Sequence, residues 1–252
     1  MSQDALDTRP RRHFLRTVIA VAGAAPLAPQ QVAGAGIAAL VAGSAAAADA
    51  PQAAGTPLQV GYACFSADEA AFVESMVNVM CPADQYTPNG VDCGLAIFID
   101  RQLAGAYGQG AGRYMSGPWA PSKPQMGLQL PLTPAQFFSA GVAAANRQCQ
   151  AQLGKTFDQL APAEADAFLK DLSHGKIKDD ELALVPWFNE LMYPLFEQAC
   201  FADPLYGGNH DKVFWKMVGY PGLPATHTLD MLDFRGKPYP GAQDPKSIID
   251  FS

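Results

Sequence analysis

The sequence predicts an all-α protein, and two observations lead to this prediction. Apolar residues recur three and four positions apart along several segments, which is the spacing of one helix face. Alternating runs of β-branched residues, which would indicate strands, are missing. Prolines and glycines separate the periodic segments. We therefore expect a single compact helical domain with long Pro/Gly-rich connectors and an extended C-terminal tail.

The first two helices are expected between Ser66 and the glycines near position 110. Ser66 and Glu69 have the spacing of a capping box, and an apolar stripe follows until Pro82 ends the helix. A second helix is expected over residues 92–107, because apolar residues lie on one side of it and polar residues on the other. Gly108 and the glycines after it end this helix.

The third helix has the clearest boundaries. Thr133 is a predicted N-cap, Pro134 stands at the first helical position, and Gln136 completes the capping box. Gly154 supplies the expected C-terminal stop. A shorter fourth helix is expected from Pro162 to the glycine at position 175.

A fifth helix is expected to begin near Pro186 and to contain Pro194. The proline ring removes one backbone hydrogen bond and clashes with the preceding turn, so we expect a kink there. Beyond residue 222 the composition shifts to Pro, Gly, Asp and Lys with scattered apolar residues. Such a tail is either disordered or laid along a partner, and the spaced apolar residues favour the second alternative.

Residues 1–48 have the features of an export signal. Arg11 and Arg12 precede Phe14, Leu15 and an apolar run, which resembles the twin-arginine signal that sends folded proteins across a bacterial inner membrane. The alternative is the basic segment of an ordinary secretory signal. Neither apolar run reaches the roughly 20 residues that span a bilayer, so a retained anchor is not favoured. Both alternatives predict a periplasmic protein.

The composition indicates a partner protein and not a nucleic acid. The chain has a formal net charge of −7, so it lacks the cationic surface that binds phosphate backbones. Only 16% of its residues are charged, whereas 49% are hydrophobic. Because this leaves little charge to cover a surface, we expect apolar surface to be buried against another subunit.

The five cysteines exclude several kinds of site. They form no CxxC, no CxxCH and no paired Cys/His spacing, which argues against a thioredoxin-like site, haem attachment and structural zinc. In an oxidising periplasm, disulfides are the usual state. Cys81 and Cys93 are the best candidate pair, because the segment between them is rich in turn residues. The odd cysteine is either a buried free thiol or a covalent link to a partner.

The sequence predicts no catalytic residue, metal site or cofactor site in this chain. His174, His210 and His227 lack a ligand or nucleophile at a diagnostic spacing, and no GxGxxG fingerprint is present. The rival hypothesis is a stand-alone periplasmic enzyme or ligand-binding module. That hypothesis would use a polar set made of Asp100, Arg101, Asp203 and His210.

The most specific segment covers residues 201–222 and reads FADPLYGGNHDKVFWKMVGYPG. It resembles the small third subunit of the gluconate 2-dehydrogenase family. Further matching stretches precede it in the same order: residues 82–84, 98–108, 117–119 and the helix after Thr133. The resemblance covers roughly residues 60–222. Cys81, Cys93 and the long signal depart from the family pattern.

The resemblance implies a complex in which other chains carry out the redox chemistry. A large FAD-binding subunit would oxidise gluconate or a related sugar acid, and a multihaem cytochrome c subunit would pass the electrons to quinone. This chain would be the small non-catalytic companion, without a cofactor of its own. It would support the export and stability of the flavoprotein, and it would be held at the inner membrane through its partners.

The sequence therefore divides into a signal region (1–48), a helical small-subunit domain (49–222) and a C-terminal tail (223–252). Within the domain, Tyr206, Gly207, Gly208 and Asn209 predict a tight turn, since glycine permits positive φ and asparagine bonds nearby backbone. Large aromatic residues supply much of the binding energy at interfaces. Four of them are candidates for the partner interface or, alternatively, for the core: Phe201, Tyr206, Trp215 and Tyr220.

Overall fold

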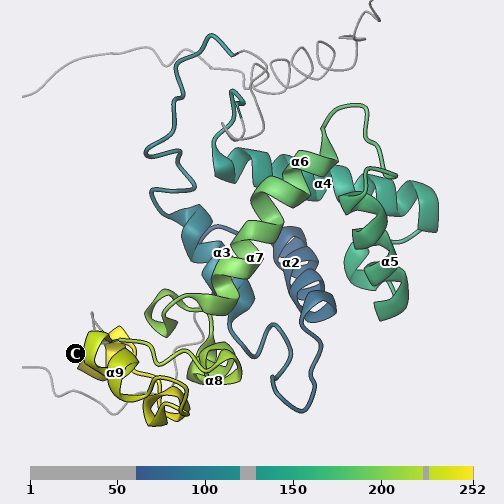
Figure 1. Cartoon of the computed structure of the whole chain (residues 1–252). Coiled ribbons are helices and arrows are strands. Elements are labelled where there is room, and N and C mark those ends of the chain that lie inside the picture. Colours follow the sequence, from purple (N-terminus) through teal and green to yellow (C-terminus); the bar gives the residue numbers. More distant parts are fainter. Residues whose placement is uncertain (1–60, 120–128, 224–226, 252) are drawn as a thin grey trace, which may run out of the picture.

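The computed structural model describes residues 61–119, 129–223 and 227–251, and the regular secondary structure in these ranges is helical (Figure 1). The expected all-α class is confirmed. A single isolated bridge between Gly222 and Lys246 is the one β-type contact in these ranges. The predicted export signal, with Arg11, Arg12, Phe14 and Leu15, lies outside the described residues. No helix in the described part of the chain has the length and apolar character needed to cross a bilayer.

Helix α2 (Ala67–Met80) begins and ends where the sequence predicts. The Ser66 hydroxyl accepts a hydrogen bond from the Glu69 amide at 3.3 Å, and the Glu69 carboxylate accepts one from the Ser66 amide at 2.8 Å. The next helix, α3 (Leu95–Ala104), is shorter than the expected 92–107. Gly94 adopts a left-handed conformation with φ +77°, which interrupts helical geometry before Leu95.

Two further helices confirm the predicted start and stop signals. Helix α4 (Pro134–Leu153) has the predicted Thr133–Gln136 capping box, and Gly154 ends it in the left-handed conformation. Helix α5 (Pro162–Ser173) follows a short 3₁₀ turn, η2 (Phe157–Gln159).

The fifth predicted helix is one continuous rod built from three parts. It consists of α6 (Leu184–Trp187), a π-helical turn η3 (Phe188–Met192) and α7 (Tyr193–Phe201). The amide of Tyr193 bonds the carbonyl of Phe188, five residues earlier, directly before Pro194. We attribute the wide turn to Pro194, because its ring needs room and cannot donate the next hydrogen bond. The helix also begins before Pro186.

The core lies where α2, α3, α4 and the α6–α7 rod meet, with α7 between α3 and α2 in Figure 1. Phe72, Phe157 and Trp187 are fully buried at its centre, and the ring centroids of Phe72 and Phe157 are 4.6 Å apart. Gly141 makes room for the indole, since a Cβ at this position would stand 1.9 Å from Nε1 of Trp187. The close approach of α4 to α6 therefore requires glycine there.

The segments after α7 form a separate layer at one end of the molecule, away from α4 and α5 (Figure 1). In order they are η4 (Pro204–Tyr206), η5 (His210–Lys212), α8 (Val213–Val218), α9 (Thr228–Asp233), η6 (Pro240–Gln243) and η7 (Ile248–Phe251). The described part of the tail differs from the extended tail that we expected. It contains short helical turns, and it lies against α8 and η4 of its own chain.

The predicted disulfide between Cys81 and Cys93 is absent, and all five cysteines are free thiols. The two residues are nevertheless neighbours, as the turn-rich segment between them indicated. The Sγ atoms of Cys81 and Cys93 lie 3.8 Å and 3.5 Å from the carbonyl oxygen of Pro88, to which both thiols donate. The sequence thus predicted the approach of the two side chains, which share this carbonyl as an acceptor and form no covalent bond with each other.

Candidate partner-binding site

The turn segment, which we define as residues 203–212, joins α7 to α8. Asp203 caps its first 3₁₀ turn, because Oδ1 accepts a hydrogen bond from the Leu205 amide at 3.0 Å. Asn209 is completely buried and ties the two helices together. Its Nδ2 donates to the carbonyl of Ala202 at 3.1 Å, and its Oδ1 accepts from the Phe214 amide at 3.0 Å.

The two glycines of the turn segment allow it to lie close to helices α3 and α7. Gly207 has φ +101°, and a Cβ there would stand 2.8 Å from Nη1 of Arg101 on α3. A Cβ on Gly208 would stand 2.4 Å from the carbonyl oxygen of Ala199 on α7. A larger residue at position 208 would push the turn segment off α7, and one at position 207 would be strained by the positive φ, so both positions favour glycine.

Trp215 belongs to the interior of the chain. Its side chain is only 5% exposed, and Nε1 donates a hydrogen bond to the carbonyl of Phe201 at 2.9 Å. The Tyr220 ring packs edge-on against it, with 5.1 Å between ring centroids. Of the two alternatives left open by the sequence, the structure places Trp215 in the core of its own subunit.

The other three candidate interface residues lie at the surface. Phe201 is 50% exposed, Tyr206 is 49% exposed and Tyr220 is 45% exposed. Leu205 in the same turn segment is 47% exposed. Side chains of this size rarely stand half in water without a partner when they gather in one region.

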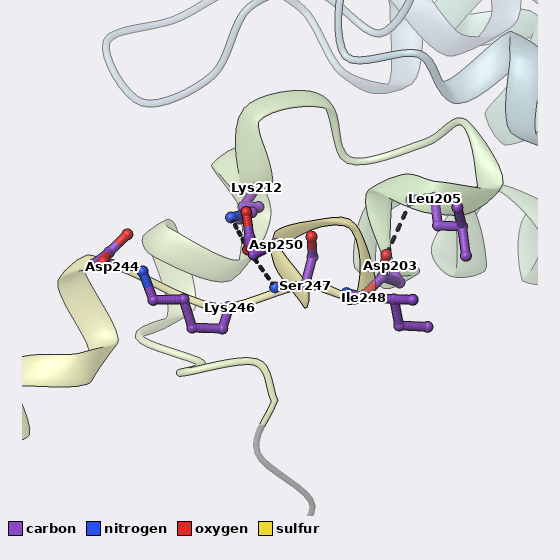
Figure 2. Close-up of polar contacts among 8 residues, drawn as sticks. All are labelled: Asp203, Leu205, Lys212, Asp244, Lys246, Ser247, Ile248 and Asp250. Carbon is purple, nitrogen blue, oxygen red and sulfur yellow. Dashed lines mark hydrogen bonds and ion pairs between the residues drawn. The ribbon is translucent and has the colours of Figure 1, made fainter. Parts of the chain in front are cut away.

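The end of the tail, residues 246–251, runs across the turn segment, and we call it the strap (Figure 2). Its first residue pairs with residues 221–223 through two backbone hydrogen bonds, of 2.7 Å and 3.0 Å. The Ile248 amide then donates to Oδ2 of Asp203 at 2.9 Å. Asp250 forms an ion pair with Lys212 at 2.5 Å and also accepts a hydrogen bond from the Ser247 amide at 2.7 Å.

The strap is held by charge as well as by hydrogen bonds. The Lys212 ammonium beside Asp250, together with the Ser247 amide, lowers the pKa of this carboxyl below its ordinary value. At neutral pH the Asp250 carboxylate is therefore ionised where it faces Lys212. Because both side chains are partly solvated, we expect the ion pair to contribute little to global stability and to act mainly on the position of the strap.

Three of the residues required by the rival enzyme hypothesis have structural roles, because they hold backbone segments in place. Asp100 is buried and accepts three backbone hydrogen bonds, from the amides of residues 63, 64 and 65. Asp203 binds the turn segment and the strap, and the His210 ring contacts the carbonyl of Asp92 at 3.0 Å. The described residues contain no group of three or more His, Cys, Asp or Glu side chains placed to hold a metal ion.

A hollow of about 290 Å³ lies between the 112–119 loop and helix α4. Arg113 is its one charged lining residue, and the rest of the lining is apolar, aromatic or amide. The polar set of the rival hypothesis is not part of this lining. The structure therefore does not bring the proposed catalytic residues and this hollow together.

The sequence did not indicate the strap contacts. Lys212 and Asp250 are 38 positions apart, and Asp203 and Ile248 are 45 positions apart. No local spacing rule joins residues at such distances. The one signal available was the run of isolated apolar residues in the tail, which indicated that the tail packs against something.

Comparison with known families gives one finding about the chain as a whole. Residues 67–222 match the family described as gluconate 2-dehydrogenase subunit 3, so the match covers more than half of the chain and includes the turn segment and α8. No curated protein and no solved structure matches. The family match agrees with the resemblance found in residues 201–222, and this chain belongs to the gluconate 2-dehydrogenase subunit 3 family.

Proposed function

We propose that this chain is the non-catalytic small subunit of an FAD-dependent dehydrogenase of gluconate or a related sugar acid, and that it binds the flavoprotein subunit. One observation carries the proposal. Twelve of the sixteen exposed large apolar side chains in the described residues lie between residues 201 and 251, a region whose first part, residues 201–222, falls within the family match. Exposed apolar surface concentrated in this way is typical of a binding surface.

The physical role of the chain follows from this surface. Burying half-exposed aromatic and aliphatic side chains against a partner removes them from water, and this stabilises both proteins. The low charge content agrees with a molecule that has part of its surface covered in its working state. The family's name, which describes a numbered subunit, is consistent with such a partner.

In this proposal the redox cofactors belong to other chains. FAD is held by the large subunit and haem c by a multihaem cytochrome subunit, which also keeps the complex at the inner membrane. The sequence supports this division, since it has neither a GxGxxG fingerprint nor a CxxCH haem motif. The residues of this chain provide contacts and no electron transfer.

Export is the second part of the proposal. The paired arginines at positions 11 and 12 resemble a signal for the transport of folded proteins, and a flavoprotein must take up FAD before it leaves the cytoplasm. The small subunit binds the folded flavoprotein in the cytoplasm and carries it to the periplasm as a passenger. It then remains bound and stabilises the enzyme.

Immunoprecipitation of the full chain from the periplasm of its native host tests the binding. The expected precipitate contains a second polypeptide with flavin absorbance, together with gluconate-dependent reduction of an artificial electron acceptor. A chain that precipitates without any flavoprotein would contradict the proposal. So would a chain that oxidises gluconate or another sugar acid on its own.

The export role is tested by changing Arg11→Lys and Arg12→Lys together. We expect both this chain and the flavoprotein to accumulate in the cytoplasm, because the machinery requires the arginine pair. An Arg9→Lys change outside the pair is the control, and it should leave export intact. A flavoprotein that still reaches the periplasm with the double variant does not depend on this chain for its transport.

A further inference from the structure

The strap and the turn segment present their large apolar side chains side by side. Leu205 and Tyr206 come from η4, and Ile248 and Phe251 come from η7, two elements that contact each other. These four side chains are 47%, 49%, 40% and 68% exposed, respectively. We call them the docking face. In Figure 2, Leu205 and Ile248 flank Asp203, which binds the backbone of both segments.

We propose that the docking face is the surface by which this chain binds the flavin-containing dehydrogenase subunit, and that the strap supplies half of it. This inference rests on the proposed function, because it identifies where the proposed partner binds. It adds a segment that lies outside the family match at residues 67–222. The strap would therefore extend the binding surface beyond the residues that match the family.

The docking face is organised before any partner arrives. The strap is fixed at three points: its backbone pairs with residues 221–223 and binds Asp203, and its Asp250 side chain pairs with Lys212. A segment that is already ordered pays less conformational entropy when it binds, which raises affinity for the same contacts. A free tail with the same residues would have to order itself on the partner first.

Three charged side chains next to the docking face are already paired within the chain. Lys212 is paired with Asp250, and the carboxylate of Asp203 accepts two backbone hydrogen bonds. A partner can therefore cover this region without leaving these charges buried and unpaired. This matches the centres of known interfaces, which are poor in unpaired charge and rich in aromatic and aliphatic anchors.

The dehydrogenase subunit is the occupant that the observations favour over a second copy. The docking face is continuous with the turn segment, which belongs to the family match, and that family is named as one subunit of a dehydrogenase. A third subunit must contact another kind of chain in its complex. Self-association through the same face is an alternative that the following experiment separates.

The test compares two double variants of the full chain that change side chains of matched exposure. Tyr206→Ser with Phe251→Ser alters the docking face, where the side chains are 49% and 68% exposed. Tyr193→Ser with Tyr86→Ser alters sites outside it, where they are 43% and 66% exposed. Each chain is immunoprecipitated from its host, the bound flavin is measured by absorbance, and the melting temperature of the purified chain confirms its folding.

We expect the docking-face variant to lose roughly tenfold or more of the bound flavoprotein, and the control variant to retain it. Equal capture by the two variants would overturn the proposal, as would equal loss from both. A wild-type chain that captures no flavoprotein contradicts the proposed function itself, and this inference falls with it. If the wild-type chain instead pairs with a second copy, and the docking-face variant abolishes that pairing, the dehydrogenase subunit is not the occupant.

A charge exchange tests the strap separately without removing apolar surface. Asp250→Lys alone places two ammonium groups together and should release the strap, which lowers flavoprotein capture. Lys212→Asp combined with Asp250→Lys restores an opposite pair in reverse order and should recover part of the capture. Asp is also well tolerated at the left-handed position of Lys212 (φ +57°). Full capture by the single variant would show that the strap position does not matter for binding.

Discussion

The helical region up to Cys200 and the segment from Phe201 onward differ in the burial of their large apolar residues. The first region buries them around Phe72, Phe157 and Trp187. Beyond Cys200, Phe214 and Trp215 are the large apolar side chains that are buried in the described residues, each 5% exposed, and most of the others stand in water. The first region can account for its own stability by packing. The second leaves surface that only another molecule can bury.

Trp215→Ala is expected to have the largest effect on this comparison, because Trp215 is the larger of the two buried apolar side chains beyond Cys200. Its removal should lower the free energy of unfolding of the isolated chain by about 3–5 kcal/mol, through lost burial and the cavity that remains. Tyr220→Ala changes its half-exposed neighbour and should cost about 1 kcal/mol or less. Urea unfolding of the two variants measures the difference, and similar values for both would contradict the buried position of Trp215.

Gly141→Ala tests the packing of the first region. The added Cβ would stand 1.9 Å from Nε1 of Trp187, and we expect a loss of about 1–3 kcal/mol in the free energy of unfolding. Combining it with Trp187→Phe should show a smaller loss than the sum of the single changes, because the smaller ring makes room. Additive losses in this double-mutant cycle would mean that the two residues do not contact.

Alkaline pH is expected to lower the free energy of unfolding gradually. Burial raises the pKa of Cys93, Cys149 and Cys200 from an ordinary value of 9.0 to about 12. The unfolded chain therefore loses these protons at lower pH than the folded chain does. The stability from keeping the thiols neutral is complete below about pH 9 and is lost as pH rises towards about 12.

Urea unfolding at several alkaline pH values measures this effect, and Cys149→Ala should make the decline less steep. The same burial predicts that a thiol reagent labels exposed Cys64 first in the folded protein. Rapid labelling of Cys149 at neutral pH would contradict its enclosed position.

The sequence predicted the local features of the fold well, because each depends on neighbours a few residues away. The capping boxes at Ser66 and Thr133 and the stop at Gly154 are decided within one or two turns of chain. The π-turn before Pro194 was visible only as an expected kink, since the choice between a bend and a wider turn depends on packing.

The candidate site was predicted only in part, for the same physical reason. Its aromatic residues were identified, but whether Trp215 or Tyr206 faces water depends on how α8 folds against α7. The strap depends on contacts made by Asp203 and Lys212 across long stretches of chain. No spacing rule anticipates such contacts, and the free state of Cys81 and Cys93 was likewise beyond what spacing could decide.

Asp100 has a consequence for the maturation of the chain. Its carboxylate fastens the backbone of residues 63–65 to α3, so the amino-terminal edge of the helical body is secured from within. A peptidase that trims the polypeptide anywhere ahead of Gly61 leaves all three of these bonds in place. The helical body therefore keeps this attachment whichever site the processing enzyme selects upstream.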